Sequence, residues 1–216
     1  MSTAEWELRT RDGRLELIHP ESPDEPGLAA SFVVDRRAHA PSRSKKQPLA
    51  RALGRESRRV LDATAGLGYD AILMASIGFD VVAVERHPLV HALFEDGLRR
   101  ARENSSIDDV IVDRVRAVHD EGAAWLDREP WDVVYIDPMF PPRKKRSALP
   151  RKRIQWLRAL VGSDDDAADL LRRATACCRR VVVKRADDGP PLGGIEPAAS
   201  LRGKIARYDV IISPGR

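Results

Sequence analysis

The chain has 216 residues, of which 43% are hydrophobic and 32% are charged, with a formal net charge of +4. This length predicts one large domain, or one domain with a small appendage, and enough apolar residues to form a core. The chain lacks the run of roughly 20 apolar residues that a membrane helix needs. It also lacks the basic and apolar start of a signal peptide, so we expect a cytoplasmic protein without a membrane partner.

The only cysteines, Cys177 and Cys178, are adjacent in the sequence. Neighbouring cysteines rarely pair, so we interpret them as two reduced thiols. One cysteine pair and five scattered histidines indicate no metal site.

The N-terminal part predicts a small β structure followed by a basic connector. Residues 6–18 alternate apolar and polar side chains around Asp12-Gly13, which is typical of a β-hairpin. We expect a third short strand at residues 31–35. Residues 36–59 then hold nine Lys or Arg against the single acid Glu56, with helical spacing near their end. Residues 1–58 are therefore predicted to form a hairpin extension and connector, and residues 59–216 the main domain.

From Arg59 onward, predicted strands and helices alternate, which is typical of a parallel α/β sheet. The sequence predicts strands at residues 59–62, 79–85, 114–119, 131–137, 180–184 and 205–212. It predicts helices near residues 70–77, 88–101, 154–160 and 167–177.

A glycine turn, Asp62-Ala-Thr-Ala-Gly66-Leu-Gly68, joins the first of these strands to its helix. Glycines let the backbone approach a ligand closely, and the helix start directs free N–H groups at it. Nicotinamide-dependent oxidoreductases use a similar turn, so the pattern alone leaves the ligand open.

Acidic residues lie at the carboxyl ends of the predicted strands, at one rim of the sheet: Asp62, Glu85, Glu121 and Asp137. Clustered like charges repel, and a cationic ligand such as a sulfonium with an amino group would relieve this. Glu85 lies 17 residues after Gly68, near the position where an acid binds ribose hydroxyls.

The tetrapeptide Asp137-Pro138-Met139-Phe140 suits chemistry on an exocyclic nucleobase amine. The Asp137 carboxylate and the Pro138 carbonyl would accept the two amine hydrogens, and Phe140 would stack on the base. With an activated methyl donor, positioning and electrostatics would supply most of the catalysis, without a metal. We therefore expect a methyltransferase that uses S-adenosylmethionine (SAM).

A basic segment directly follows the tetrapeptide, since residues 143–158 hold eight Lys or Arg and no acid. These side chains could bind the phosphates that flank a target nucleotide. The residues predicted to contact nucleic acid are Arg143, Lys144, Lys145 and Arg146, together with Lys184 at the end of a strand. Composition does not choose between RNA and DNA.

Several segments together resemble the small-subunit ribosomal RNA methyltransferase J family, whose members are described as guanine-N2 methyltransferases of 16S rRNA. They are Asp62–Gly68, Glu85-Arg86, Asp137-Pro-Met-Phe-Pro141, Ser147-Ala-Leu149, Leu160-Val-Gly162 and Val181-Val-Val-Lys-Arg185. The resemblance covers residues 30–212 and implies a Rossmann-like class I SAM-dependent methyltransferase with a seven-stranded, mostly parallel sheet. Its cofactor contacts would fall on Tyr69, Asp70, Glu85, Arg86, Glu121, Gly122 and Asp137, in addition to Asp62, Gly66 and Gly68 of the turn.

Two departures from the family pattern concern the cofactor site. Tyr69 stands where the family commonly has Arg, and Glu121-Gly122 stands where it has a Ser pair.

The resemblance implies methylation of guanine N2 in 16S rRNA, with the rRNA or the small ribosomal subunit as partner. The tetrapeptide does not separate guanine N2 from adenine N6, so an adenine-N6 methyltransferase of DNA or RNA is an alternative. A nicotinamide-dependent oxidoreductase and a non-catalytic ribosome-assembly factor are the others. The sequence carries no prediction of oligomeric state.

Overall fold

The computed structural model describes residues 5–32, 47–105, 107–139, 152–162, 164–204 and 206–214, with the side chains of residues 152–154 excepted. No helix in these ranges is long and apolar enough to cross a membrane.

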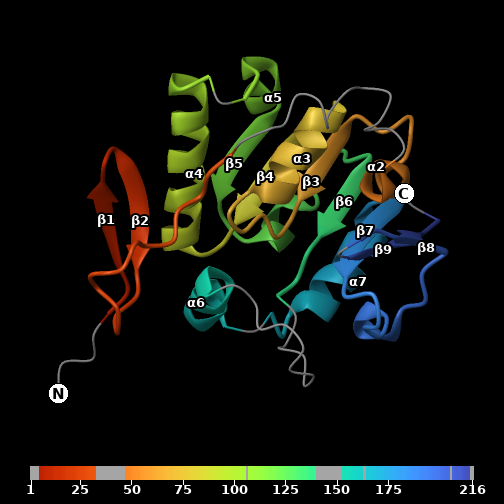
Figure 1. Cartoon of the computed structure of the whole chain (residues 1–216). Helices are drawn as coiled ribbons and strands as arrows, with labels where there is room; N and C mark the ends of the chain where they lie inside the picture. Colours follow the sequence, from red (N-terminus) through yellow and green to blue (C-terminus); the bar gives the residue numbers. More distant parts are fainter. Residues whose placement is uncertain are drawn as a thin grey trace.

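The main sheet has seven strands in the order β5-β4-β3-β6-β7-β9-β8 (Figure 1). The strands are β3 (Arg59–Asp62), β4 (Asp80–Glu85), β5 (Val115–His119), β6 (Val133–Ile136), β7 (Arg180–Arg185), β8 (Ala199–Arg202) and β9 (Arg207–Ile212). Neighbouring strands from β5 to β7 are parallel, while β9 runs antiparallel to both β7 and β8. The seven-stranded, mostly parallel sheet is therefore confirmed.

Strand order reverses between β3 and β6, because the chain extends the sheet through β4 to one side and later returns through β6 to the other. In sheets of this kind, ligands bind outside the carboxyl ends of the strands at this point. The end of β3, the turn that follows it and the end of β6 therefore form the natural ligand site.

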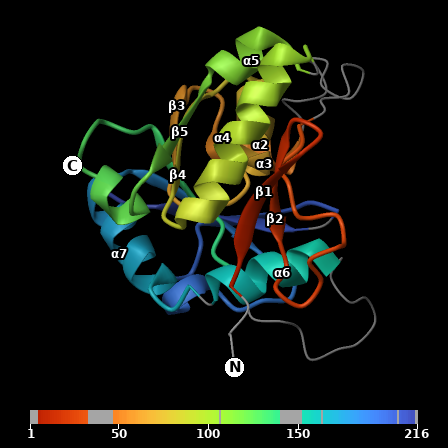
Figure 2. The same cartoon turned by 90° about the vertical axis from the view of Figure 1, so that its left-hand side faces the viewer.

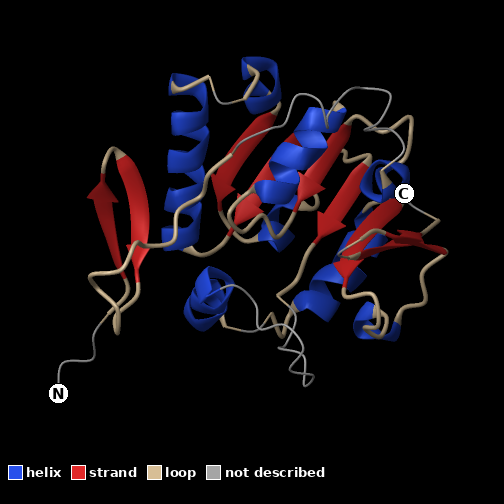
Figure 3. Ribbon diagram, in the orientation of Figure 1, coloured by secondary structure: helices blue, strands red, loops and turns tan. Residues whose placement is uncertain are grey.

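Helices cover both faces of the sheet (Figures 2 and 3). One face packs against α2 (Pro48–Leu53), α3 (Tyr69–Ile77), α4 (Pro88–Glu103) and α5 (Asp109–Asp113). The other packs against the 3-10 helix η1 (Gly122–Trp125) and α7 (Ala167–Cys177). A further helix, α6 (Lys152–Val161), lies beyond the carboxyl ends of the central strands, and a second 3-10 turn, η2 (Leu192–Gly194), contacts α7.

The central strand β6 shows why the predicted strands are nearly continuous apolar runs. Val133 and Tyr135 belong to the core on the α3 side, whereas Val134 and Ile136 belong to the core on the α7 side. All four are fully buried. A strand buried on both faces loses the polar alternation that marks a half-exposed strand.

Besides the two 3-10 helices, one strand and one α-helix were not predicted. Strand β8 is short and mostly exposed at the edge of the sheet, so its sequence lacks an apolar pattern. Helix α5 has only five residues, and its start is stabilised by Asp108, whose carboxylate accepts a hydrogen bond from the N–H of Val110.

The predicted hairpin is confirmed as β1 (Glu7–Arg11) and β2 (Arg14–Ile18), paired antiparallel. Asp12 and Gly13 both have positive φ, at 52° and 71°, as a two-residue type I′ turn requires. Of the third strand predicted at residues 31–35, residues 31 and 32 are not in a strand, and residues 33–35 lie outside the described ranges. Leu28 instead forms an isolated antiparallel bridge with Leu17.

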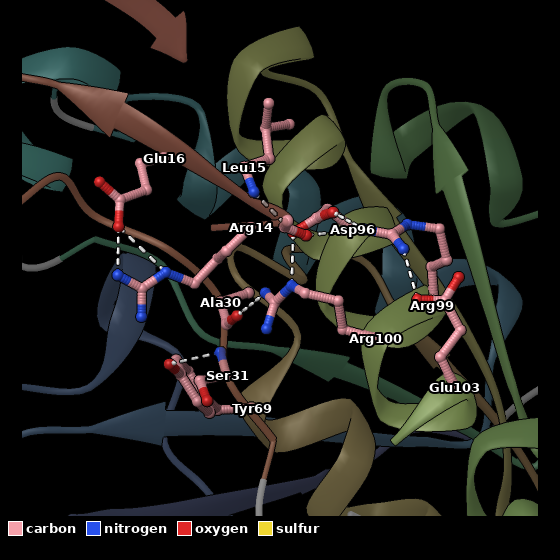
Figure 4. Close-up of polar contacts among 11 residues, drawn as sticks. Arg14, Leu15, Glu16, Ala30, Ser31, Tyr69, Asp96, Arg99, Arg100 and Glu103 are labelled. Atoms are coloured by element: carbon pink, nitrogen blue, oxygen red, sulfur yellow. Dashed lines mark hydrogen bonds and ion pairs between the residues drawn. The ribbon is translucent and has the colours of Figure 1, made fainter. Parts of the chain in front are cut away.

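The hairpin and the segment after it pack against α4 (Figure 4). The Leu15 N–H donates to Asp96 of α4 at 3.1 Å, and Arg100 donates to the same carboxylate at 2.7 Å and to the carbonyl of Ala30. Leu17, Ala30 and other apolar residues of this segment share one core with α4. The division at residue 58 stays a prediction.

Candidate active site

The turn after β3 brings backbone to the ligand side of the sheet at two glycines. Gly66 and Gly68 have φ values of +55° and +81°. A Cβ at Gly68 would lie 2.0 Å from the ring of Phe94, so no larger residue fits there. A Cβ at Gly66 would meet nothing within 4 Å. The turn thus presents bare backbone to open space at Gly66 and leads directly into the first N–H groups of α3.

Glu85 ends β4 next to this turn. Its carboxylate accepts hydrogen bonds from the N–H of Gly66 at 2.8 Å and from the N–H of His87 at 2.7 Å. Burial raises the pKa of Glu85, while these two hydrogen bonds oppose the increase. Each carboxylate oxygen has a second lone pair, so Glu85 can also accept hydrogen bonds from ligand hydroxyls.

Asp62, at the end of β3, is only 1% exposed. Its carboxylate accepts a hydrogen bond from the N–H of Thr64 at 3.2 Å. Burial, together with the negative charges of Asp70 and Asp137, raises the pKa of Asp62 well above its usual range. A cation bound next to these carboxylates would relieve this repulsion.

Lys184, near the end of β7, joins two of the carboxylates. Its Nζ donates to Asp70 Oδ2 at 2.7 Å and to Asp137 Oδ2 at 2.8 Å. Asp70 Oδ2 also accepts a hydrogen bond from the Tyr135 hydroxyl at 2.7 Å. Burial disfavours the charge of Lys184, but the carboxylates of Asp137 and Asp70 outweigh it and raise the pKa of Lys184 above its usual value.

Asp137 itself has a perturbed carboxyl group. Burial raises the pKa of Asp137 to about 6, a shift that Lys184 opposes and that Asp70 reinforces. Asp70 and Asp137 thus share one ammonium group, and Asp62 lies within electrostatic reach of all three. The carboxylates outnumber the ammonium, which suits the site to a cationic ligand.

The backbone around Asp137 is held by two side chains. The Asp137 N–H donates to Thr64 Oγ1 at 2.7 Å, and the Met139 N–H donates to Asp164 Oδ2 at 2.5 Å. Asp164 in turn pairs with Arg86 at 2.5 Å. The loop that carries Asp137 and Pro138 is therefore tied to the glycine turn on one side and to the segment before α7 on the other.

The structure also shows polar residues that the sequence did not single out: Thr64, Tyr135 and Asp164. Thr64 lies within the glycine turn, and Tyr135 is two residues before Asp137, so position offered a signal for both. Asp164 belongs to the run Asp164-Asp165-Asp166, which follows the family-like segment ending at Gly162.

Three residues that are predicted to contact the cofactor interact with other residues of the protein in this structure. The Tyr69 ring packs edge-on against Phe32 at 5.5 Å, and its hydroxyl oxygen accepts a hydrogen bond from the Ser31 N–H. Arg86 pairs with Asp164 and Asp166. The exposed residue Glu121 donates its N–H to the neighbouring Asp120 carboxylate.

Gly122 approaches the glycine turn closely, since a Cβ there would lie 2.1 Å from the carbonyl oxygen of Ala63. The strand ends therefore bring together these predicted site residues: Asp62, Gly66, Gly68, Asp70, Glu85, Gly122, Asp137 and Lys184. Phe140, Arg143, Lys144, Lys145 and Arg146 lie outside the described residues. Among the residues that the structure does describe, no three His, Cys, Asp or Glu side chains are placed to hold a metal ion.

A Rossmann-like sheet of this strand order, with a glycine turn and acids at its switch point, is the architecture of a SAM-dependent methyltransferase. A family model described as "Putative SAM-dependent methyltransferase" matches residues 1–213. The protein is a methyltransferase of this class, which decides against the nicotinamide-dependent oxidoreductase.

The particular family follows from curated relatives. "Ribosomal RNA small subunit methyltransferase J" of Shewanella sp. (strain ANA-3) is 41% identical, over 97% of this chain and 83% of its own length. The protein of the same name from Shewanella oneidensis is 40% identical, over 98% of this chain and 88% of its own. The chain belongs to the ribosomal RNA small subunit methyltransferase J family.

Solved structures agree on the fold. A SAM-dependent methyltransferase from Neisseria gonorrhoeae is 28% identical with a TM-score of 0.73, covering 100% of this chain and 86% of that one. The 16S rRNA N2 G1207 methyltransferase of T. Thermophilus, solved with AdoMet and guanosine, is 19% identical with a TM-score of 0.51. That match covers 97% of this chain and 50% of the other, and shows the fold alone.

The site fits SAM on its own geometry. The carboxylates of Asp62, Asp70 and Asp137 suit a ligand with a sulfonium and an ammonium group. Glu85 offers free lone pairs for ribose hydroxyls, and the open space at Gly66 lets a ligand approach the turn.

Proposed function

We propose that the enzyme transfers the methyl group of SAM to the exocyclic N2 amine of a guanosine in 16S rRNA. The observation that carries the proposal is the position of Asp137-Pro138 at the end of β6, beside the glycine turn and among carboxylates. The relatives' name supports small-subunit rRNA as the substrate, and the resemblance to that family supports guanine N2 over adenine N6.

The chain's part in the reaction is to prepare the amine. The nitrogen lone pair of a nucleobase amine is delocalised into the ring, so it is a poor nucleophile. The Asp137 carboxylate and the Pro138 carbonyl accept hydrogen bonds from the two N–H groups of the amine. These hydrogen bonds favour a lone pair localised on the nitrogen.

Bound SAM supplies a methyl group activated by its sulfonium. The Asp137 carboxylate stabilises the positive charge that develops on the nitrogen. The nitrogen would gain the methyl group as its bond to the sulfonium breaks, leaving S-adenosylhomocysteine. The nitrogen would then release one of its two protons to water, so one N–H remains.

Other residues bind the two ligands in this proposal. The Glu85 carboxylate accepts hydrogen bonds from the ribose hydroxyls. The remaining cofactor contacts come from Asp62, Gly66, Gly68, Tyr69, Asp70, Arg86, Glu121 and Gly122. Phe140 stacks on the target base, and Arg143, Lys144, Lys145 and Arg146 contact RNA phosphates. An rRNA substrate would place the enzyme in the cytoplasm.

The test is methylation in vitro with labelled SAM and three substrates: 16S rRNA, small ribosomal subunits and duplex DNA. Mass spectrometry of the nucleosides should show N2-methylguanosine in the RNA product. Asp137→Asn should abolish turnover while the protein remains folded, because the amide cannot stabilise the developing charge.

Asp113→Asn is the matched control, since Asp113 lies on α5 near the amino end of β5 and its side chain is 71% exposed. It should retain full activity. N6-methyladenine in DNA as the sole product would contradict the proposal. A fully active Asp137→Asn would contradict the role of Asp137.

A further inference from the structure

Lys184 has an arrangement that a phosphate contact does not explain. It stands opposite Tyr208 of β9 in the sheet, and its Nζ lies within 2.8 Å of one oxygen each of Asp70 and Asp137. Its side chain is 25% exposed, and those of Asp70 and Asp137 are 19% and 30% exposed. The ammonium is therefore partly buried between two carboxylates at the strand ends.

We propose that Lys184 is a positioning residue for methyl transfer, which holds Asp137 Oδ2, keeps the carboxylate ionised and leaves Oδ1 for the substrate amine. This inference rests on the proposed role of Asp137. It replaces the RNA contact that the sequence predicts for Lys184 with a role inside the site.

The hydrogen bonds fix Asp137 at two points. Thr64 accepts from its backbone N–H, and Lys184 donates to Oδ2. Because Lys184 holds Oδ2, the orientation of the whole carboxylate is fixed. Its other oxygen, Oδ1, therefore points in a set direction and makes no hydrogen bond to Lys184. Charge-assisted hydrogen bonds of this kind are short and strong, so they orient the group as well as stabilise it.

Asp70 completes the arrangement. It shares the ammonium with Asp137 and is itself held by the Tyr135 hydroxyl. Moving Lys184 out to a phosphate would leave two partly buried carboxylates without their cation, which is costly. The geometry thus favours a fixed Lys184.

The charges around Asp137 explain why a cation is needed. Among the described residues, Tyr135 of β6 and Tyr208 of β9 face the Asp137 carboxyl group as neutral phenols, because burial and the nearby carboxylates raise the pKa of both. The carboxylates of Asp62 on β3, Asp70 on α3 and Asp164 before α7 disfavour a further negative charge on Asp137. Burial acts in the same direction, and Lys184 opposes both. Without Lys184, Asp137 would hold its proton to a higher pH, and a protonated carboxyl cannot stabilise positive charge on the amine.

The first test needs no substrate. The Asp137 carboxyl carbon is followed by NMR against pH, and its signal is assigned by its loss in Asp137→Asn. In the wild type we expect a midpoint near pH 6. Lys184→Met removes the cation at similar length and should raise the midpoint by about one unit or more.

Asp70→Asn should shift the same midpoint in the opposite direction, because it removes a negative charge and leaves Lys184 to Asp137 alone. This second variant keeps the test decisive if Lys184→Met folds poorly. Identical midpoints in the wild type and either folded variant would overturn the proposal.

The second test uses the pH profile of kcat with 16S rRNA as substrate. The ionised form of Asp137 is active, so kcat falls as the pH drops through the Asp137 pKa. Lys184→Met should move this fall to higher pH, and Lys184→Arg should restore much of the wild-type profile. Lys204→Met, at an exposed lysine between β8 and β9, should match the wild type.

A Lys184→Met defect confined to the KM for RNA, with an unchanged kcat profile, would mean a phosphate contact and overturn the inference. Failure of the wild type to methylate RNA would instead refute the proposed function. The NMR titration would still test whether Lys184 lowers the pKa of Asp137.

Discussion

The backbone N–H of Met139 donates a hydrogen bond of 2.5 Å to the carboxylate of Asp164. The two residues are 25 positions apart and belong to the loop after β6 and the segment before α7. Asp164 also pairs with Arg86, directly after Glu85 at the end of β4. The loop that carries Asp137 and Pro138 is thereby linked to the predicted ribose site.

Loss of this link should slow methyl transfer. Asp164→Ala removes the acceptor for the Met139 N–H, so the Pro138 carbonyl loses its fixed position, and misplacement of this kind can cost about 100-fold in rate. We expect kcat to fall by roughly 10- to 100-fold, with little change in the affinity for S-adenosylhomocysteine. Steady-state kinetics and calorimetry measure the two quantities.

Asp166→Ala is the control for that variant, because Asp166 pairs with Arg86 and its side chain is 59% exposed. It should keep a kcat close to that of the wild type. Equal kcat values for Asp164→Ala and the wild type would show that this hydrogen bond does not position the loop.

The two glycines of the turn should respond differently to alanine. Gly68→Ala forces a Cβ to within 2.0 Å of Phe94 as well as a positive φ, so it should lower the stability by more than about 2 kcal/mol. The Cβ added by Gly66→Ala meets nothing within 4 Å, so this variant should lower the stability only by the backbone strain of a positive φ, about 1–2 kcal/mol. Chemical denaturation compares them.

Phe94→Leu in the Gly68→Ala background should recover part of the lost stability, since it removes the ring that the new Cβ meets. Gly66→Ala should weaken binding of S-adenosylhomocysteine, because the methyl group occupies space on the ligand side. Equal stabilities of the two single variants would contradict the close contact with Phe94.

The hairpin should depend on Arg100 more than on its neighbour Arg99 (Figure 4). Arg100 is 15% exposed in its side chain and donates to Asp96 and to the Ala30 carbonyl. Arg100→Ala removes the donor to the Ala30 carbonyl and one of the donors to Asp96, which keeps Leu15 and Arg99, and should cost about 1–3 kcal/mol. Arg99 is 49% exposed, and its surface ion pairs are worth at most about 1 kcal/mol. Arg99 contacts the hairpin through an exposed hydrogen bond of 3.2 Å to the Gly13 carbonyl.

Urea denaturation of Arg100→Ala and Arg99→Ala tests this difference directly. Hydrogen exchange should also show earlier opening of β1 and β2 in Arg100→Ala than in Arg99→Ala. A larger loss of stability in Arg99→Ala would contradict this view of how the hairpin is anchored.

In the enzyme without its cofactor, ionisation of the buried Asp62 carboxyl should lower the free energy of unfolding. Its pKa is raised in the fold by burial and by the neighbouring carboxylates, so its contribution to stability is present at low pH and is lost as the pH rises through that pKa. Asp62→Asn should therefore raise the Tm increasingly with pH, and the difference should vanish in acid. Calorimetry from pH 4 to pH 9 measures it.

The same variant should bind S-adenosylhomocysteine more weakly, because one negative charge and one acceptor of the site are changed. A Tm difference that stays constant with pH would mean that ionisation of Asp62 does not oppose folding.

Much of the fold could be predicted because its central strands are buried on both faces and read as apolar runs, as β6 does. The Asp12-Gly13 turn could also be predicted from the sequence, because few dipeptides tolerate two positive φ values. Strand β8 could not be predicted, because an exposed edge strand of four residues carries no apolar pattern.

The site was predictable where chemistry follows directly from a strand end, as at Asp62, Glu85 and Asp137. It was not predictable where side chains distant in sequence meet. Lys184 and Asp70 are 114 residues apart, and only the fold brings the start of α3 and the end of β7 to the same edge of the sheet. A lysine at a strand end therefore suggested a phosphate contact, whereas the structure places it between two carboxylates.

The most direct measurement is quantitative mass spectrometry of nucleosides from 16S rRNA of cells that lack the gene, complemented with the wild type or with Asp137→Asn. We expect N2-methylguanosine to fall when the gene is absent, to be restored by the wild type and not to be restored by Asp137→Asn. An N2-methylguanosine content that is the same in all three strains would contradict the proposed function.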